Sequence, residues 1–287
     1  MSTLRLTAAL LAVGALAACG GGSDTASGGR SVLASFYPLE YAAQQIGGGE
    51  LEVANLTPPG VEPHDLELTP RDVARVQDAD VVLYLDAGFQ PAVDDAVADA
   101  RGEVVDLLEG LQLRDAVGDE TVSDPHVWLD PTLYARVVEQ LGGVLDSPEG
   151  ARTLATKLRA LDATFRAGLD SCARRELVTS HAAFGYLAAR YGLEQVPLTG
   201  VTPEAEPTPR RLEEAVRRVR ETGATTIFFE TLVSPRVAET VARETGARTA
   251  VLNPIEGLTQ EQAARGDDYF TLMRANLRAL RQALGCS

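Results

Sequence analysis

Residues 148–170 read PEGARTLATKLRALDATFRAGLD, and this stretch decides how the rest of the chain is divided. Leucine and phenylalanine recur at spacings of three and four from Leu154 to Leu169 without an internal proline, which predicts one long amphipathic helix. Ser147 and the proline after it form a suitable helix start. At about 1.5 Å per residue the helix is about 33 Å long, enough to cross from one lobe to another. We therefore predict that residues 147–171 form a stiff helix that connects two lobes.

On both sides of this helix, short apolar runs alternate with longer amphipathic segments. This alternation is typical of βαβ units and parallel sheets. We therefore predict an α/β fold with two Rossmann-like lobes, residues 31–146 and 172–287. The expected strands are 31–36, 51–56, 81–85, 103–106, 176–180, 194–197, 225–229 and 249–252, and the other expected helices are 38–46, 69–77, 91–100, 132–145, 182–191, 209–222, 235–245 and 267–284.

The N-terminal segment has the features of an export signal followed by a tether. Residues 1–18 place Arg5 before an apolar run too short to span a bilayer, which predicts a signal peptide. The motif LAAC at residues 16–19 resembles a bacterial lipobox, which implies cleavage before Cys19 and acylation of its thiol. The alternative is an ordinary signal peptide with a chance cysteine. Because residues 19–30 are rich in Gly and Ser, we expect an extracytoplasmic protein on a flexible, lipidated tether at the outer face of the cell membrane.

The charge balance argues against nucleic acid as a partner. The chain has 26 basic and 41 acidic residues, a formal charge of −15. Such a surface repels phosphates and attracts cations only non-specifically. Acidic surfaces also serve solubility alone, so the charge excludes one class of partner without identifying another. We expect a monomer that binds no nucleic acid.

The two cysteines that remain after Cys19 are Cys172 and Cys286. In an exported chain a disulfide is the expected state of such a pair. A bond to Cys172 would also hold the C-terminus in place, because Cys286 is next to the last residue. Two buried free thiols are the alternative. Zinc ligation by these cysteines is disfavoured, because neither is near a histidine in the sequence.

A histidine in a rigid turn is the first candidate for a functional residue. Residues 124–131 read DPHVWLDP and place His126 between two prolines and beside the only tryptophan, Trp128. Proline fixes its own φ and disfavours helix in the residue before it, so we expect a stiff extended turn. Asp130 before Pro131 is also a good helix start, which explains the second proline but not the histidine.

The three histidines share a position in the predicted fold. His64 follows the second expected strand, His181 follows the first strand of the second lobe, and His126 comes near the end of the first lobe. Open parallel sheets bind ligands outside the carboxyl ends of their strands, so we expect the histidines to meet there. Neutral imidazole is the commonest metal-binding side chain, and three of them favour zinc over manganese or calcium.

The sequence leaves two candidates for a fourth ligand. Glu256, in the loop 253–257, follows the last expected strand and therefore emerges at the same edge as His181. Glu230, at the end of the strand before it, is the competing candidate. Carboxylates are too common in this chain to decide between them by counting.

Several motifs together resemble a known family, the metal-binding lipoproteins of bacterial zinc and manganese ABC importers. The resemblance covers nearly all of the mature chain, and the motifs are specific in combination. They are EPHD at 62–65 with TP at 69–70, DPHVWLDP at 124–131, SHAAFGY at 180–186 with YGL at 191–193, FE at 229–230, NPIEGL at 253–258, and DY at 268–269 with Met273, Asn276 and Leu277. The resemblance implies two α/β lobes that close on one metal ion, with a permease and its ATPase as partners. Carried over by position, the metal ligands are His64, His126, His181 and Glu256.

The metal that this resemblance implies is zinc. Manganese members are similar but have a carboxylate at the position of His181 and an aspartate in the last loop, whereas three nitrogens and one oxygen favour zinc. The segment 114–123 departs from many zinc members, because it is short and acidic and lacks their His-rich loop. We therefore expect no secondary zinc capture by this segment.

Two other classes of protein compete with a transport subunit. A zinc hydrolase would use the three histidines, a bound water and Glu230 or Glu256 as a base, but the chain has no His-Glu-x-x-His motif. A surface lipoprotein with a purely structural metal, such as an adhesin, would not fold without its metal, whereas a transport subunit stays folded when empty. A closed site of four protein ligands binds an ion without reaction, so we expect no enzyme.

Overall fold

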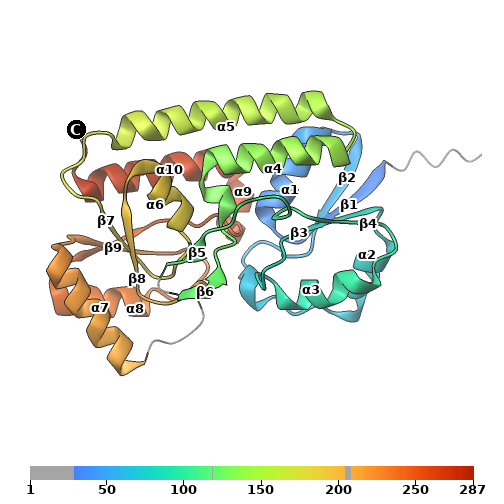
Figure 1. Cartoon of the computed structure of the whole chain (residues 1–287). Coiled ribbons are helices and arrows are strands. Elements are labelled where there is room, and N and C mark those ends of the chain that lie inside the picture. The colour runs from blue at the N-terminus through green and yellow to red at the C-terminus, as the bar shows by residue number, and fades with distance from the viewer. Residues whose placement is uncertain (1–28, 118, 204–207) are drawn as a thin grey trace, which may run out of the picture.

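The described part of the chain forms two α/β lobes beneath a layer of long helices (Figure 1). The computed structural model describes residues 29–117, 119–203 and 208–287. The expected signal peptide, the acylated Cys19 and most of the tether lie outside these residues. Within the described ranges, no helix is both long and apolar enough to cross a membrane.

Each lobe is built on a four-stranded sheet in which all neighbouring strands are parallel. The strand order is β2-β1-β3-β4 in the first sheet and β10-β9-β7-β8 in the second. If the strands of the second sheet are renumbered from β7 and read from its β8 edge, both sheets have the same order, 2-1-3-4. The predicted α/β class with two Rossmann-like lobes is therefore confirmed. The strands are β1 (Arg30–Ala34), β2 (Leu51–Asn55), β3 (Val81–Tyr84), β4 (Glu103–Asp106), β7 (Glu176–Thr179), β8 (Glu194–Pro197), β9 (Thr226–Phe229) and β10 (Arg248–Val251).

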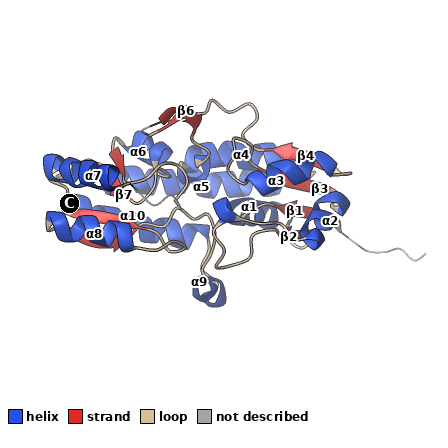
Figure 2. Cartoon of the chain, turned by 90° about the horizontal axis from the view of Figure 1, so that it is seen from below, coloured by secondary structure: helices blue, strands red, loops and turns tan. Residues whose placement is uncertain are grey.

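Helices cover the sheets and join the lobes. We call the first sheet with α1 to α3 the N-terminal lobe, and the second sheet with α6 to α8 the C-terminal lobe. Figure 2 shows α9 standing apart from both sheets near the junction of the lobes. The helices are α1 (Tyr37–Gly47), α2 (Pro70–Asp78), α3 (Pro91–Ala96), α4 (Pro131–Val144), α5 (Pro148–Leu169), α6 (Gly185–Tyr191), α7 (Pro209–Thr222), α8 (Arg236–Thr245), α9 (Gln260–Arg265) and α10 (Tyr269–Leu284), with 3-10 turns η1 (Pro63–Asp65), η2 (Val97–Asp99) and η3 (Val127–Leu129).

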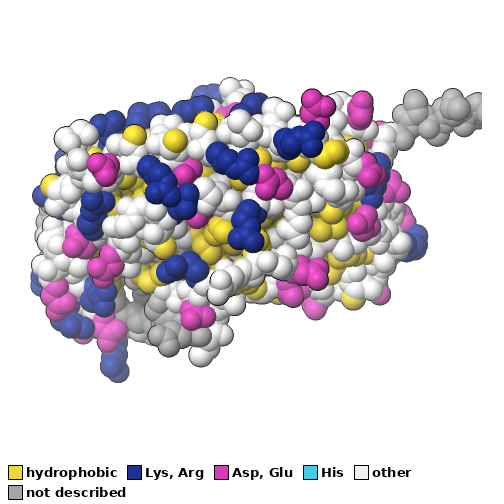
Figure 3. All heavy atoms as spheres, turned by 45° about the horizontal axis from the view of Figure 1, so that its top comes forward, with side chains coloured by type: hydrophobic (Ala, Val, Ile, Leu, Met, Phe, Trp, Pro, Cys, Tyr) yellow, Lys and Arg dark blue, Asp and Glu magenta, His cyan; other side chains and the backbone are white. Residues whose placement is uncertain are grey.

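Helix α5 runs across both lobes above α4 and α10, as Figure 1 shows. Its buried face, which includes Leu154, Leu158 and Phe165, belongs to one hydrophobic core that contains residues of both sheets. Its other face is exposed, and Figure 3 shows Lys and Arg side chains spread over this side of the molecule. A helix with one apolar stripe must bury that stripe, so the shared core fixes both lobes against α5.

A disulfide joins Cys172, at the entry to the C-terminal lobe, to Cys286, just after α10. The two cysteines are 114 residues apart and pair as an isolated bridge. A cross-link that closes so long a loop restricts the unfolded chain, and such bonds typically contribute about 2–4 kcal/mol to stability. The C-terminal lobe therefore begins and ends at one covalent link.

The fold differs from the expected elements in three places. The segment 114–123, where no strand was expected, contains a short antiparallel hairpin of β5 (Asp115–Ala116) and β6 (Asp119–Ser123). The helix expected from residue 182 begins only at Gly185, and the backbone N–H of Ala182 donates instead to Gly200 O, 2.8 Å away. Helix α9 was not expected, although Thr259 and Gln262 form its capping box.

The central position of α5 makes its core residues decisive for stability. We predict that Leu158→Ala lowers the free energy of unfolding by about 2–5 kcal/mol, because Leu158 is fully buried and its removal leaves a cavity. Lys157→Ala, on the exposed face of the same turn, should change it by less than about 0.5 kcal/mol. Urea unfolding of both variants measures the difference, and equal losses would contradict the packing described here.

Candidate metal centre

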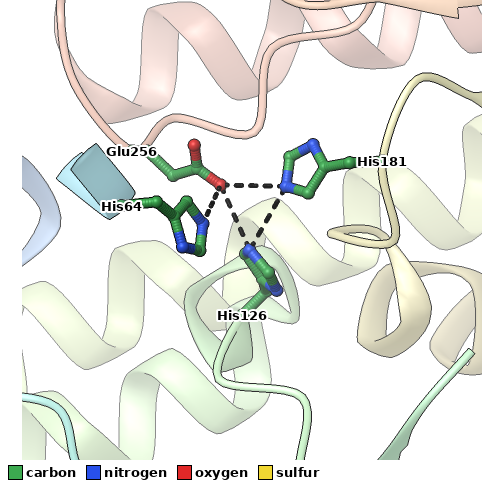
Figure 4. A group of neighbouring side chains, drawn as sticks. All are labelled: His64, His126, His181 and Glu256. Carbon is green, nitrogen blue, oxygen red and sulfur yellow. Dashed lines mark hydrogen bonds and ion pairs between the residues drawn. The ribbon is translucent and has the colours of Figure 1, made fainter. Parts of the chain in front are cut away.

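The four side chains predicted as ligands converge where the two lobes meet (Figure 4). One candidate ligand atom from each of His64, His126, His181 and Glu256 lies within 4.8 Å of the others. His64 lies in η1, His126 directly precedes η3, and the other two follow β7 and β10. Residues from four separate segments are thus brought to one point.

Four of the six separations between these atoms are close to the edges of a tetrahedron around zinc, and the other two are within 4.8 Å. Glu256 Oε1 lies 3.1 Å from Nε2 of His126, 3.3 Å from Nε2 of His181 and 3.7 Å from Nε2 of His64. The Nε2 atoms of His126 and His181 are 3.4 Å apart. Ligand atoms bound at about 2.0–2.2 Å to a tetrahedral zinc are about 3.4 Å from one another. The donor set and its spacing therefore fit this ion.

The four side chains are almost completely buried. His126 and His181 are 0% exposed and Glu256 is 1% exposed, and no histidine reaches the face shown in Figure 3. Among the described residues, Nε2 of His64 and Oε2 of Glu256 have no hydrogen-bond partner. Buried polar atoms without partners cost free energy, and a bound cation would satisfy them.

The loop that carries Glu256 is held in a strained shape. Ile255 has a φ of 59°, in the left-handed region that β-branched residues rarely adopt. Its N–H donates to Oδ1 of Asn253 at 2.7 Å. Asn276 on α10 in turn binds the N–H of Asn253 at 2.8 Å and its carbonyl at 2.6 Å. Strain of this kind persists only where surrounding bonds enforce it, and here those bonds direct Glu256 toward the histidines.

The turn that carries His126 is bound to the C-terminal half of the chain. The indole N–H of Trp128 donates to the carbonyl of Pro254 at 2.7 Å, and Tyr269 OH donates to the carbonyl of Trp128 at 2.7 Å. The centroids of the Trp128 and His126 rings are 5.1 Å apart. The tryptophan therefore lies beside the site and links the loop of His126 to the loop of Glu256.

The imidazoles have different electrostatic surroundings. Burial lowers the pKa of His64, and attraction to Glu256 offsets this only in part. Burial also acts to lower the pKa of His126, but hydrogen bonds to Asp124 and Glu256 outweigh it and raise the value. In His181 the same burial is outweighed by Glu230 and Glu256, and the pKa is well above its usual range. Burial would raise the pKa of Glu256, but the histidines hold it well below its usual value.

Besides Asp124, two further buried carboxylates lie next to these four residues. Burial, with repulsion from Glu256 and Glu230, raises the pKa of Glu62 to about 10. Glu230, the competing candidate for the fourth ligand, lies 2.6 Å from Nδ1 of His181 and outside the group of four. Sequence reasoning did not single out Glu62, whose place two residues before His64 was the only available signal.

Residues 32–283 match the profile of a family described as ZnuA, zinc-uptake complex component A, periplasmic. The chain belongs to this family. The family resemblance inferred from the motifs is thereby confirmed, and the family is one of solute-binding transport proteins.

Two relatives illustrate the match in sequence. Zinc-binding protein AdcA of Streptococcus pyogenes serotype M6 is 35% identical over 89% of this chain and 56% of its own length. High-affinity zinc uptake system protein ZnuA of Bacillus subtilis is 33% identical over 94% of this chain and 93% of its own. The chain thus spans little more than half of the streptococcal relatives and nearly all of the Bacillus relative.

Solved structures of the family share the fold. The Zn(II)-bound ZnuA-like domain of Streptococcus pneumoniae AdcA has a TM-score of 0.75 and 33% identity, covering 90% of this chain and 99% of that domain. The laminin-binding protein Lmb of Streptococcus agalactiae, described as bifunctional with adhesin and metal-transporting activity, has a TM-score of 0.80 and 30% identity over 89% of this chain and 100% of its own.

We predict that the metal-free protein loses stability as the pH rises above about 6.5. A histidine whose pKa is raised by folding contributes stability below its unfolded pKa and loses that contribution as the pH rises through the folded pKa. His126 and His181 both act in this direction, and so does Glu62, whose folded pKa of about 10 lies above its unfolded value. The opposite effect of His64 is confined to lower pH, because folding lowers its pKa.

Urea unfolding of chelator-treated protein between about pH 6 and 9 tests this dependence. Added zinc serves as the control, because it binds neutral imidazoles and should weaken or reverse the trend. Stability that stays constant or rises over this range without metal would contradict the prediction.

Proposed function

We propose that this protein is the extracytoplasmic zinc-binding subunit of an ABC importer, which captures Zn²⁺ and delivers it to a permease driven by its ATPase. The observation that carries this proposal is the cluster of His64, His126, His181 and Glu256, whose donor atoms come within 4.8 Å of one another. Relatives named for zinc binding and zinc uptake support it. Zinc is here the transported substrate.

The composition of the cluster supports zinc over manganese. Three imidazole nitrogens and one carboxylate oxygen suit a borderline ion that accepts tetrahedral coordination. Manganese prefers more oxygen ligands and higher coordination numbers. His181 is the residue that gives the set its third nitrogen.

The same geometry supports binding without reaction. Catalytic zinc sites keep one coordination position for water or substrate, whereas four protein ligands fill a tetrahedral site. The ligands are also buried, with Glu256 only 1% exposed, so a larger substrate has no direct access to the ion. Release then requires the lobes to move apart, and the proposed lobes are residues 31–146 and 172–287 with 147–171 as the connecting helix.

The proposed location follows from the N-terminal residues. A signal peptide at residues 1–18 and an acylated Cys19 would place the folded part outside the cytoplasm, tethered to the membrane beside its permease. One relative, from Streptococcus pneumoniae serotype 4, is named zinc-binding lipoprotein AdcA. We propose the same kind of anchor for this chain, which would act as a monomer.

Zinc titration of single variants tests the proposed function. His64→Ala, His126→Ala, His181→Ala and Glu256→Ala should each lower zinc affinity by more than the roughly 10- to 100-fold expected for a residue that only supports a ligand. Competition with a chromogenic chelator measures the affinity. In wild-type protein, zinc should bind more tightly than manganese, and the metal-free protein should keep its circular dichroism spectrum.

Asp65→Ala is the matched control, because Asp65 is an exposed carboxylate next to His64 and should leave the affinity unchanged. Wild-type protein that binds manganese more tightly than zinc would contradict the proposal. So would a chain that unfolds when the metal is removed, because that behaviour belongs to a structural metal site.

A further inference from the structure

A histidine binds a metal through one ring nitrogen, and the partner of the other nitrogen determines how well it does so. In a neutral imidazole, an Nδ1–H that donates to a carboxylate leaves Nε2 without a hydrogen, and the bond keeps the ring from turning freely. In this site His126 and His181 direct Nε2 toward Glu256. The groups that contact their Nδ1 atoms therefore influence the orientation and the tautomer of these two rings.

At His126 this group is Asp124. One oxygen, Oδ1, lies 2.8 Å from Nδ1 of His126 and accepts the backbone N–H of the same residue at 2.9 Å. Both side chains are 0% exposed, so water does not compete for these bonds. An aspartate that binds the backbone two residues onward closes a tight local turn. The ring of His126 is consequently fixed to its own backbone through one carboxylate.

Asp124 is itself placed by the C-terminal lobe. Tyr186 OH donates to the carbonyl of Asp124 at 3.0 Å. A Cβ added to Gly185 would be only 2.6 Å from Oδ2 of Asp124, so the carboxylate occupies space that a side chain at this position would take. Neither Tyr186 nor Gly185 is one of the four candidate ligands. The placement of Asp124 therefore does not depend on a bound ion.

At His181 the corresponding group is Glu230. Its Oε1 lies 2.6 Å from Nδ1 of His181 and accepts a hydrogen bond from Ser180 Oγ. This contact is not aligned as a hydrogen bond, because Nδ1 has no hydrogen-bond partner among the described residues. The nearby carboxylate charge of Glu230 still attracts a hydrogen to Nδ1 in preference to Nε2. Glu230 follows β9, which pairs with β7 before His181. Adjacent strands thus deliver both groups.

His64 has no such group. Among the described residues, the only carboxylate at ion-pair distance from its imidazole ring is that of Glu256, 3.7 Å from Nε2. Its ring instead packs edge-on against Phe89, with centroids 4.5 Å apart. The contrast shows that two of the three histidines are oriented by dedicated carboxylates.

We propose that Asp124 and Glu230 are positioning residues of the metal centre, which keep Nε2 of His126 and His181 free of hydrogen and directed at the ion without binding it. This inference rests on the proposed zinc-binding function. A carboxylate at Nδ1 also makes the imidazole a stronger donor. The two residues therefore influence zinc affinity without being ligands themselves.

The test compares Asp124→Ala, Asp124→Asn, Glu230→Ala and Glu230→Gln with wild type. Each alanine variant should lose about 10- to 100-fold in zinc affinity. The amide variants, which keep an acceptor oxygen but no charge, should lose less. Long-range ¹H–¹⁵N NMR of the zinc-loaded protein should show Nδ1-protonated rings for His126 and His181 in wild type, and a changed signal for the affected ring in each alanine variant.

Asp162→Asn is the control for loss of a buried carboxylate, since Asp162 binds Arg190 and Tyr191, neither of which is a candidate ligand. It should lower thermal stability and leave zinc affinity and ring signals unchanged. If an alanine variant does not fold, Asp124→Asn and Glu230→Gln decide through their ring signals and affinities. If all four variants keep zinc affinities within about threefold of wild type and His126→Ala still abolishes binding, this inference is overturned. If wild-type protein binds no zinc, the proposed function is overturned as well.

Discussion

The hydrogen bond from the indole of Trp128 to the carbonyl of Pro254 is the contact on which the metal centre depends. It joins two segments 126 residues apart, and both partners are buried. His126 lies two residues before the tryptophan and Glu256 two residues after the proline. One bond in a water-free environment therefore holds two candidate ligands in register, and the strained Ile255 is retained because this contact and the Asn253–Asn276 pair leave the loop no relaxed alternative.

The charge around this contact explains why the site suits a cation. Glu62, Asp124, Glu230 and Glu256 are all buried, and among the described residues none of them forms an ion pair with lysine or arginine. Their only basic neighbours are imidazoles, which must be neutral to bind a metal. Burying uncompensated carboxylates is costly. A divalent ion among the imidazoles offsets this cost, and without the ion proton uptake by His126, His181 and Glu62 offsets it instead.

The helical layer determines how these loops can move. Three of the four candidate ligands are held by the C-terminal half of the chain. His181 and Glu256 belong to that half, and the turn of His126 is hydrogen-bonded to it through Pro254 and Tyr269, although this turn follows the N-terminal sheet in the chain. Only His64 belongs to the N-terminal lobe, and its loop is joined to the loop of Glu256 by a hydrogen bond of 2.8 Å from Gly60 N–H to Leu258 O. Since α5 shares one continuous core with both lobes, we expect the separation of His64 from the other ligands to be a small movement rather than a large swing.

Much of this could be predicted from the sequence, because it depends on local patterns. Strand and helix periodicity gave the α/β class, the long helix and most element boundaries, and the histidines after strands indicated a zinc site with Glu256 or Glu230 as the fourth ligand. The tertiary structure alone brought the donor atoms within 4.8 Å and placed Glu230 outside that group, beside Nδ1 of His181. It also revealed where Asp124, Glu62 and Trp128 lie relative to the site, and the hairpin at β5 and β6. These features arise from contacts between segments far apart in the chain, whereas periodicity records only neighbours along it.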